Sequence, residues 1–407
     1  MKLLFIGGVF DPGYIEEIVN NSKGPIQFAA NTLQWMIISG LDYHNGEPVS
    51  ILNVPFVGSY PKLYSKLVIH GRKWSHSPNA VDYDIGYLNY FGIKFIWRCL
   101  VMARGAGRWL KRTRGHKERA IIVYSLNTPL LLAGVVAKKL DPSIHLCVIV
   151  PDLPDNTIMG GTVSKFLQFL LSQNNRISYR LIKVADSFVL LTKHMVEPLK
   201  VEKRPFVVVE GMVDPEEQLF SESNMGRTEK KIILYTGLLE KRYGIVDLLN
   251  AFSQISNPEY ELWIRGDGVG ISVVQERMRQ DPRIKWIDRL SRVELLKLQQ
   301  NATVLVVLRD NKELSSRYSF PLKMMEYLLS GTPIITRKVL GIPEEYYSYT
   351  FAIEDSGAQA LAEAIVNICE LPVEEWSRIG ELARNFVRSQ KNYLTQTERI
   401  YSLIKNR

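Results

Sequence analysis

A glycine loop followed by two cations has the composition of a phosphate-binding turn. Residues 235–244 leave a probable strand, open a loop at Gly237, and carry Lys241 and Arg242 before a helix starts near Gly244. Backbone N–H groups and the positive dipole end at a helix N-terminus attract an anion, and nearby cations add charge-assisted contacts. The run also fits an ordinary strand–helix turn with solvated cations, so it leaves both interpretations open.

A carboxylate near the start of a later helix is a second candidate for ligand binding. A loop with Pro321 leads into an apolar-periodic helix that carries Glu326 and ends at Gly331. About one turn into that helix, a carboxylate can accept hydrogen bonds from both hydroxyls of a ribose, while the helix amides face a diphosphate. The alternative is that Glu326 only compensates the helix dipole.

The glycine turn at residues 266–270 argues against a nicotinamide cofactor. Gly266, Gly268 and Gly270 do not have the G-x-G-x-x-G spacing, and Asp288 has no following strand that would suit a dinucleotide site.

Asp82-Tyr-Asp84 has the spacing of a metal–diphosphate clamp. Two acids at this spacing arise easily by chance, and a clamp belongs at a strand end. The six histidines show no ligand spacing, so we expect no metal site.

Short apolar runs alternate with longer amphipathic segments along the whole chain. Such interleaving predicts an α/β protein whose parallel sheets are covered by helices on both faces. The pattern stops at a polar stretch and then restarts, which predicts two doubly wound, Rossmann-like domains with ligands at the strand carboxyl ends, facing a cleft. The predicted parts are a first domain at 1–213, a linker at 214–230, a second domain at 231–385, and a C-terminal segment at 386–407. That segment belongs to one long helix over 373–405, long enough to return to the first domain.

The charge of the chain is concentrated in one region. The 407 residues are 46% hydrophobic and carry a net charge of +9, which fits a globular protein and excludes a disordered or collagen-like chain. Residues 60–119 alone hold 13 Lys and Arg against three acids. Aromatic residues lie among cations over 88–114, as in helices that bind an anionic bilayer surface. A packed helix with a solvated face is the alternative, and no nucleic-acid recognition module is visible.

Cysteine use and hydropathy point to the cytoplasm. Three distant cysteines, Cys99, Cys147 and Cys369, lie in apolar or amphipathic runs and read as reduced side chains. No uncharged apolar stretch approaches the 18 residues that a membrane-spanning helix needs.

The order of these motifs resembles the donor domain of family 4 retaining glycosyltransferases of the GT-B fold, closest to members that build bacterial surface polysaccharides. In the second half the resemblance is carried by Gly237…Gly244…Phe252, Arg265-Gly-Asp-Gly268, Phe320-Pro-Leu-Lys-Met-Met-Glu326 and Gly341-Ile-Pro-Glu-Glu345. In the first half it is carried by Gly7-Gly8, Gly24-Pro-Ile-Gln27, Asp152-Leu-Pro154 and residues 185–191.

The resemblance implies a nucleoside-diphosphate sugar donor of UDP or GDP type. Glu326 would hold the ribose, Lys241 or Arg242 the diphosphate, and residues 288–290 the edge of the base. The implied donor-binding residues are Gly237, Lys241, Arg242, Gly266, Asp267, Asp288, Arg289, Leu290, Phe320, Pro321, Lys323 and Glu326. The implied acceptor-binding residues are Gly7, Gly8 and Gln27, and the implied catalytic residues are Asp152, Tyr318 and Ser319.

Two sites depart from the family pattern. The family has a glutamate eight residues before Glu326, where this chain has Tyr318. Leu238 and Tyr243 replace the usual Arg and Lys of the first loop, so Lys241 and Arg242 would supply charge from shifted positions.

We therefore expect a cytoplasmic hexosyltransferase, peripheral at the inner face of the cell membrane. It would move a hexosyl unit with retention to a hydroxyl of a lipid-linked saccharide in cell-surface polysaccharide synthesis, with no cofactor, metal or nucleic acid. The alternatives are a catalytically inactive GT-B protein that binds saccharide or membrane, and a GT-B sugar-nucleotide epimerase.

Overall fold

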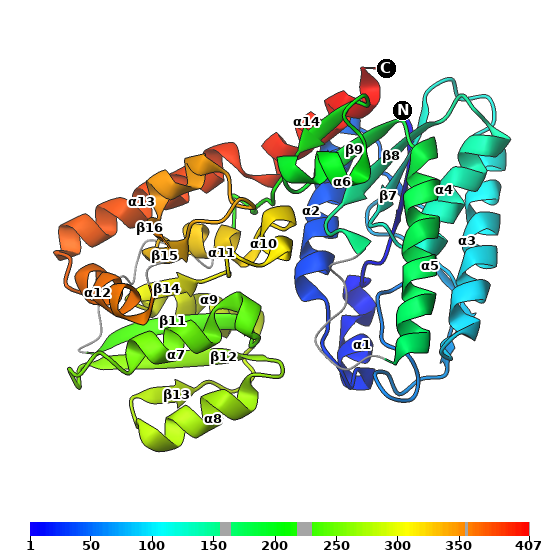
Figure 1. Ribbon diagram of the computed structural model, residues 1–407. Coiled ribbons are helices and arrows are strands. Elements are labelled where there is room, and N and C mark those ends of the chain that lie inside the picture. Colours follow the sequence, from blue (N-terminus) through cyan, green and yellow to red (C-terminus); the bar gives the residue numbers. More distant parts are fainter. Residues whose placement is uncertain (155–163, 218–229, 355–356, 407) are drawn as a thin grey trace. The chain divides into compact units, whose positions relative to one another are not determined.

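The computed structural model describes residues 1–154, 164–217, 230–354 and 357–406 (Figure 1). The chain divides into two compact units: unit 1 comprises residues 1–210 and 393–407, and unit 2 comprises residues 211–392. These boundaries stand a few residues from the predicted ones at 213 and 385. Most of the predicted linker, residues 218–229, lies outside the described residues.

Within its described residues, unit 1 is built on an eight-stranded sheet in the order β10-β9-β8-β7-β1-β2-β5-β4. Every neighbouring pair in this sheet is parallel except β4 with β5. The strands are β1 (Lys2–Gly7), β2 (Ser50–Asn53), β4 (Arg72–Trp74), β5 (Asp82–Asp84), β7 (Arg119–Tyr124), β8 (His145–Val150), β9 (Ser187–Leu190) and β10 (Phe206–Val208). A separate ribbon pairs β3 (Val68–Ile69) with β6 (Tyr87–Leu88).

The helices of unit 1 pack in two groups. The α-helices are α1 (Ile15–Asn21), α2 (Phe28–Asn45), α3 (Ile93–Arg112), α4 (Thr128–Leu140), α5 (Lys165–Leu181), α6 (Val196–Leu199) and α14 (Tyr393–Lys405), with short 3₁₀ turns η1 (Pro12–Tyr14), η3 (Ile182–Val184) and η4 (Lys193–Met195). Helix α4 packs against both α3 and α5, and α14 packs against α2. Gly40 makes that second contact close, since a Cβ there would lie 2.0 Å from the Thr397 hydroxyl oxygen.

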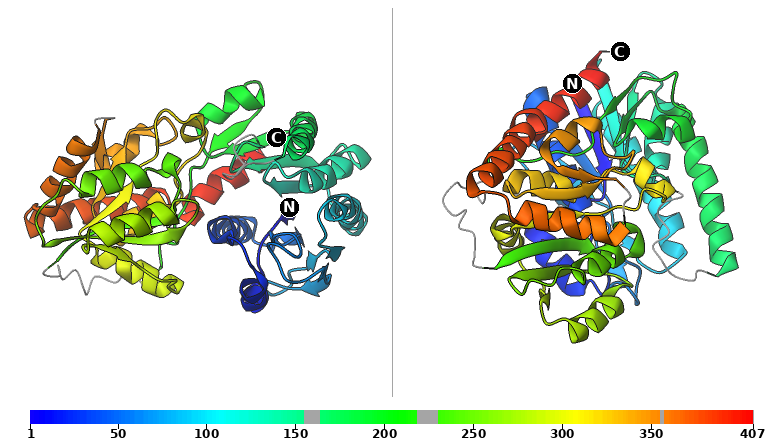
Figure 2. Two further views of the ribbon diagram at one scale, coloured as in Figure 1. Left: turned by 60° about the horizontal axis from the view of Figure 1, so that its bottom comes forward. Right: turned by 60° about the vertical axis from the view of Figure 1, so that its left-hand side comes forward.

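Unit 2 has, within the described residues, a six-stranded parallel sheet in the order β13-β12-β11-β14-β15-β16. Figure 1 labels these strands, and Figure 2 gives two further views of the ribbon. The strands are β11 (Lys231–Leu238), β12 (Tyr260–Asp267), β13 (Ile284–Trp286), β14 (Val304–Val307), β15 (Ile334–Arg337) and β16 (Phe351–Ile353). The helices are η7 (Lys241–Tyr243), α7 (Ile245–Phe252), α8 (Ile271–Gln280), α9 (Arg292–Asn301), α10 (Leu314–Tyr318), α11 (Lys323–Ser330), η8 (Glu344–Tyr349), α12 (Gly357–Cys369) and α13 (Val373–Gln390). The strand order reverses between β11 and β14, which is the doubly wound pattern with its switch point at these two strands.

Central strands of both sheets are buried on both faces, as the continuous apolar runs predict. All residues of β7 and β8 are buried, and two apolar clusters of unit 2 pack α7 with α12 and α11 with α13. The predicted α/β class with doubly wound parallel sheets is confirmed.

The last predicted helix, residues 373–405, is wrong as a single element. The structure has α13 and α14 separated at Lys391 and Asn392. The backbone N–H of Val213 donates to the Lys391 carbonyl oxygen at 3.0 Å, and the Asn392 amide donates to the Arg388 carbonyl oxygen at 2.8 Å. The helix stops here because the Val213 N–H and the Asn392 side-chain amide bind carbonyl oxygens that a continuing helix would use.

The Asp82-Tyr-Asp84 motif lies inside unit 1 as β5, and both carboxylates are buried. Asp84 accepts hydrogen bonds from Arg72, Trp74 and Asn53 at 2.6–3.0 Å. Asp82 accepts from the backbone of Ile51 and from His76, so protein donors engage both acids of the motif. No group of three His, Cys, Asp or Glu side chains among the described residues is arranged to hold a metal ion.

A buried histidine links two acids in this network. The His76 ring nitrogens lie 2.7 Å from Asp82 Oδ2 and 2.9 Å from Asp42 Oδ2. Burial alone would lower the pKa of His76, but these hydrogen bonds outweigh it and raise the pKa to about 9. The imidazolium therefore ties α2 to the loop that precedes β5.

This charge predicts how the stability of unit 1 depends on pH. Because the folded pKa of His76 is about 9 and its ordinary value is 6.5, its contribution of about 3 kcal/mol is complete below pH 6.5 and is lost as pH rises through 9. His76→Gln should lower the free energy of unfolding most at pH 6.5 and flatten its fall toward pH 9. Denaturant titrations can follow the fluorescence of Trp35 and Trp74, whose rings lie 5.9 and 6.4 Å from the imidazole. His116→Gln, at an exposed histidine, should keep the wild-type pH profile, and an equal profile in His76→Gln would contradict the assignment.

Candidate functional site

The carboxyl edge of the unit 2 sheet gathers the residues that the sequence singled out as donor-binding. The loops that follow β11, β12 and β13 begin at this edge because the three strands are parallel neighbours. Lys241 and Arg242 follow β11, Asp267 is the last residue of β12, and residues 288–290 follow β13. The site therefore stands at the switch point between β11 and β14 and beside it (Figure 1).

Two glycines shape the end of β11 and the loop that follows it. Gly237 has a φ of +127°, and Gly244 has a φ of +79°. A Cβ on Gly244 would lie 2.1 Å from the Leu308 carbonyl oxygen, so only glycine lets α7 start this close to β14. Lys241 is exposed, whereas Arg242 is half-buried and pairs with Glu240 at 2.8 Å. Of the two predicted phosphate ligands, Lys241 thus reaches solvent and Arg242 already has a carboxylate partner.

The glycine turn after β12 has a packing role. A Cβ on Gly266 would lie 1.9 Å from the Gly237 carbonyl oxygen, because β11 and β12 run side by side to their ends. The Leu239 N–H donates to the Asp267 carbonyl oxygen at 2.8 Å, and the Asp267 side chain is exposed. Gly266 thus allows the two loops to approach each other.

Lys323 projects from the first position of α11 toward the end of β11. Its Nζ donates to the Thr236 carbonyl oxygen at 3.0 Å and lies 4.2 Å from the centre of the Tyr235 ring. A Cβ on Gly237 would lie 3.7 Å from the same nitrogen. Burial, together with the nearby Arg309 guanidinium, lowers the pKa of Lys323 to about 7. An amine poised between its charged and neutral forms therefore stands beside the glycine loop.

The buried hydroxyl of Tyr327 connects α11 to the end of β11. The Tyr327 hydroxyl oxygen lies 3.1 Å from the Thr236 N–H nitrogen and 2.8 Å from the Thr236 hydroxyl oxygen. This contact fixes the helix that carries Lys323 and Glu326 relative to the strand that carries Gly237.

Residues 318–321 are anchored by a hydrogen bond from Arg309 and by the packing of Phe320 in the core. Tyr318 ends α10 and is half-buried, and the Ser319 carbonyl oxygen accepts a hydrogen bond from Arg309 at 3.1 Å. The side chain of Phe320 is buried against Tyr346, with ring centres 5.0 Å apart. The structure thus places Phe320 in the core, where only its backbone is left to serve a ligand, and Pro321 is buried as well.

Glu326 is half-buried in the first turn of α11 and pairs with Arg292. Arg292 Nη1 donates to Glu326 Oε1 at 2.9 Å, and Arg292 Nη2 donates to Glu217 Oε1 at 3.0 Å. The two carboxylates raise the pKa of Arg292 against the opposing effect of burial. Sequence reasoning missed Arg292 and Glu217; the S-x-x-E helix start at Ser291 marks where α9 begins, but nothing local shows which side chain Arg292 meets.

Residues 288–290 connect β13 to that helix. Asp288 and Arg289 are exposed, and Leu290 is half-buried. Ser291 and Glu294 form a reciprocal capping box, so the loop ends on a fixed helix start.

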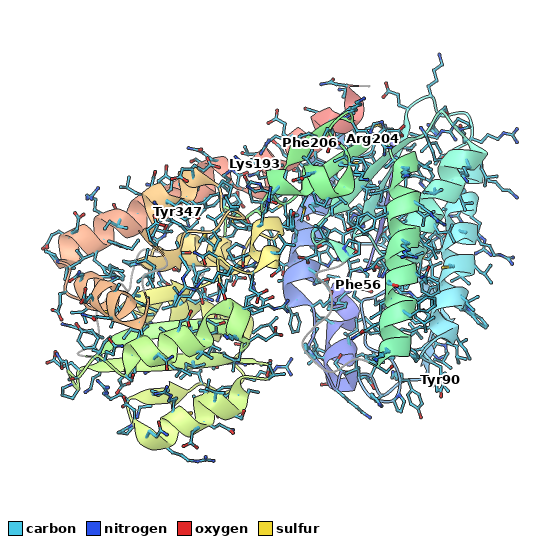
Figure 3. The ribbon with its side chains drawn as sticks, viewed as in Figure 1. Phe56, Tyr90, Lys193, Arg204, Phe206 and Tyr347 are labelled. Carbon is cyan, nitrogen blue, oxygen red and sulfur yellow. The ribbon has the colours of Figure 1, made fainter. Side chains whose placement is uncertain are left out.

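The predicted acceptor-binding and catalytic residues of the first half belong to unit 1. Gly7 ends β1, Asp152 follows β8 and is exposed, and Gln27 is exposed at the start of α2. The Gly8 N–H donates to Gln34 Oε1 at 2.9 Å, and a Cβ on Gly8 would lie 2.2 Å from the Phe56 ring, which Figure 3 labels. This glycine loop is therefore shaped by its own packing, and the Gly8 amide is already engaged.

Comparison with known proteins shows what this chain is similar to. Residues 217–386 match the Glycosyl transferases group 1 family. N-acetyl-alpha-D-glucosaminyl L-malate synthase of Bacillus anthracis is 25% identical over 260 residues, which span 61% of this chain and 65% of the relative.

Several solved structures share the fold over the whole chain. Sucrose-phosphate synthase from Thermosynechococcus elongatus aligns with a TM-score of 0.65 at 17% identity, covering 100% of this chain and 99% of its own. Anabaena HepE in complex with UDP aligns with a TM-score of 0.60 at 13% identity, covering 100% of both chains. The catalytic domain of starch synthase IV from Arabidopsis thaliana, bound to ADP and acarbose, aligns with a TM-score of 0.66 at 11% identity, covering 100% of both chains.

These findings confirm the predicted GT-B fold and show that unit 2 contains a Glycosyl transferases group 1 domain. The group 1 domain coincides with unit 2 from Glu217 to Phe386, which contains every predicted donor-binding residue.

Proposed function

We propose that this chain is a retaining hexosyltransferase that takes its sugar from a UDP- or GDP-type donor held by unit 2. The acceptor is a hydroxyl of a lipid-linked saccharide, in the synthesis of a cell-surface polysaccharide at the inner face of the cell membrane. The observation that carries the donor assignment is the grouping of Gly237, Lys323 and Glu326 around the switch point of the unit 2 sheet, within the group 1 domain. That position is where doubly wound sheets bind nucleotides.

The chemistry asked of the chain is positioning and charge stabilisation. Glu326 accepts the ribose hydroxyls, while Lys323 and Lys241 face the diphosphate, which gains negative charge as the sugar leaves. A phosphate oxygen of the leaving group takes the proton of the acceptor hydroxyl, so Tyr318 in place of a glutamate leaves this route intact. Tyr318 and Ser319 line the sugar end of the donor, and Asp152 orients the acceptor. No step of this scheme uses a metal or a cofactor.

Exposed apolar side chains on unit 1 support the membrane part of the proposal. The apolar tip of α3 consists of Tyr90, Phe91, Ile93, Ile96, Trp97 and Leu100, whose exposed fractions run from 47% to 64%. Figure 3 labels Tyr90 beside the first turn of α3. An exposed cluster of this kind marks an interaction surface. No helix among the described residues is long and apolar enough to span a bilayer.

Cations follow the apolar tip along the same helix. Arg104, Arg108, Lys111 and Arg112 are exposed, whereas Met102, Ala106 and Trp109 face the interior. In a parallel α/β unit, the helices that precede β7 and β9 begin at the carboxyl edge of the sheet. The apolar tip of α3 and the exposed Phe169 and Leu170 of α5 therefore lie at the same edge as Gly7 and Asp152. A lipid surface bound there presents a lipid-linked acceptor to these loops.

Glu326 gives a test of donor binding. In thermal melts with a panel of nucleotide sugars, at least one UDP or GDP sugar should raise the melting temperature of the wild-type protein. Glu326→Ala should abolish the rise, because it loses charged hydrogen bonds worth about 1.5–3 kcal/mol each. Glu375→Ala removes a carboxylate paired with Arg378 on α13 and should keep the rise. A rise that survives in Glu326→Ala would refute the ribose assignment.

Lys323 predicts that donor binding takes up a proton. Since its pKa is about 7 in the free protein, the amine is mostly neutral at pH 8, and a bound diphosphate should restore its charge. Titration calorimetry with UDP or GDP in buffers of different ionisation enthalpy should show uptake approaching about one proton at pH 8. Lys323→Met should lose this proton uptake. Lys241→Met should weaken nucleotide binding but keep the proton uptake. Equal uptake in the wild type and Lys323→Met would contradict the assignment.

The membrane assignment is tested by reversing charge on α3. Changing Arg104, Arg108, Lys111 and Arg112 to Glu should lower binding to phosphatidylglycerol-containing vesicles more than tenfold, since each basic residue near the surface contributes roughly 1 kcal/mol. The matched control reverses four exposed cations of unit 2, Arg279, Lys285, Lys297 and Arg378, and should keep binding. Trp97→Asp should also weaken binding, because it places a charge in the apolar tip. Co-sedimentation measures all three variants, and unchanged binding of the α3 variants would exclude this surface.

A further inference from the structure

Three segments of unit 2 meet at one guanidinium. Arg292 is the first residue of α9, Glu326 lies in the first turn of α11, and Glu217 follows the segment that enters unit 2. Arg292 Nη1 donates to Glu326 at 2.9 Å, and Nη2 donates to the two oxygens of Glu217 at 3.0 and 3.4 Å. One cation thus bridges two carboxylates that are distant in sequence.

The backbone of Arg292 is fixed more firmly than that of an ordinary surface cation. The Ser291 N–H donates to Glu294 Oε2 at 2.8 Å, and the Ser291 hydroxyl oxygen accepts from the Glu294 N–H at 3.3 Å. This capping box holds the residue immediately before Arg292. With its backbone anchored and its guanidinium fork bound on two nitrogens, Arg292 has little freedom to turn away from Glu326.

The contact leaves Glu326 able to bind a ligand. Arg292 uses one oxygen of the Glu326 carboxylate, and a carboxylate offers about four acceptor positions. Two acids and one cation leave the cluster with a net negative charge, so Glu326 stays an acceptor rather than being neutralised. Arg292 restrains Glu326 Oε1, while the carboxylate keeps acceptor positions for hydroxyl donors.

We propose that Arg292 is a positioning residue, which orients the Glu326 carboxylate to receive the ribose hydroxyls of a nucleoside diphosphate. The inference rests on the function proposed above. Only Ser291 separates Arg292 from residues 288–290, which the family resemblance places at the edge of the base, so one short segment would serve both the base and the ribose. Ribose recognition in this chain therefore depends on α9 as well as on α11.

An alternative assigns Arg292 only to stability. Its side chain is 46% exposed, and ion pairs at such exposure contribute at most about 1 kcal/mol to folding. A structural pair would change the melting temperature slightly and leave ligand selectivity untouched. The decisive measurement is therefore the preference between a ribose and a deoxyribose, which a purely structural contact does not affect.

The experiment compares a ribonucleotide with its 2′-deoxy analogue by titration calorimetry. UDP, GDP and ADP are titrated into the wild-type protein, and the tightest of them is paired with the corresponding 2′-deoxynucleoside diphosphate. We expect the wild type to favour the ribose form by about tenfold or more, the value of a hydrogen bond to a charged group. Arg292→Gln and Glu326→Gln should each reduce this preference to less than about threefold, and Arg292→Lys should retain part of it.

A matched control and a fold check make the result decisive. Arg378→Gln removes another arginine of unit 2 that binds a carboxylate through two nitrogens, and it should keep the full ribose preference. Circular dichroism and the melting temperature show whether each variant is folded. A ribose preference that persists in folded Arg292→Gln overturns this inference and leaves the proposed function standing. Failure of the wild-type protein to bind any of the three nucleotides overturns the proposed function, and this inference with it.

Discussion

The parallel pairing of β11 with β12 on one side and β14 on the other is the constraint on which unit 2 depends. Because β11 is central and the strand order reverses beside it, its carboxyl end is the one place that crossovers on both sides leave open. Gly237 and Gly266 let the two strands stay in contact to their tips, and Tyr327 bonds the end of β11 to α11. The cation and the carboxylate assigned to the donor both stand on that helix.

Carboxylate side chains have different roles in the two units. The buried acids of β5 and His76 form a closed network in unit 1, where each carboxylate has donors from the protein. In unit 2, Glu326 shares a single arginine with Glu217 and retains acceptor capacity. The difference follows from burial, since a carboxylate removed from water must find its partners within the fold, whereas a half-buried one can keep some for a ligand.

Helix α3 exposes apolar residues in its first half and basic residues in its second half. Its first half exposes Ile96 and Leu100, and its second half exposes Arg108 and Lys111 while burying Met102 and Trp109. An amphipathic pattern by itself is satisfied either by packing on a sheet or by binding a lipid surface. In the fold, α3 packs against α4 and leaves its apolar start exposed, and the lipid contact proposed above uses that exposed part.

The sequence by itself determined the α/β class, the two doubly wound sheets and the glycine loops of unit 2, because apolar runs and glycine turns are local signals. The sequence order of Gly237, Lys323 and Glu326 carried the resemblance to glycosyltransferases, which the group 1 match bears out. Only the tertiary structure decided that Asp82 and Asp84 belong to a core network, that residues 391–392 break the last helix, that Phe320 is a core residue and that Arg292 meets Glu326. These outcomes depend on partners tens of residues away in the chain, and no local pattern records which buried donor or carboxylate a side chain will reach once the strands have paired.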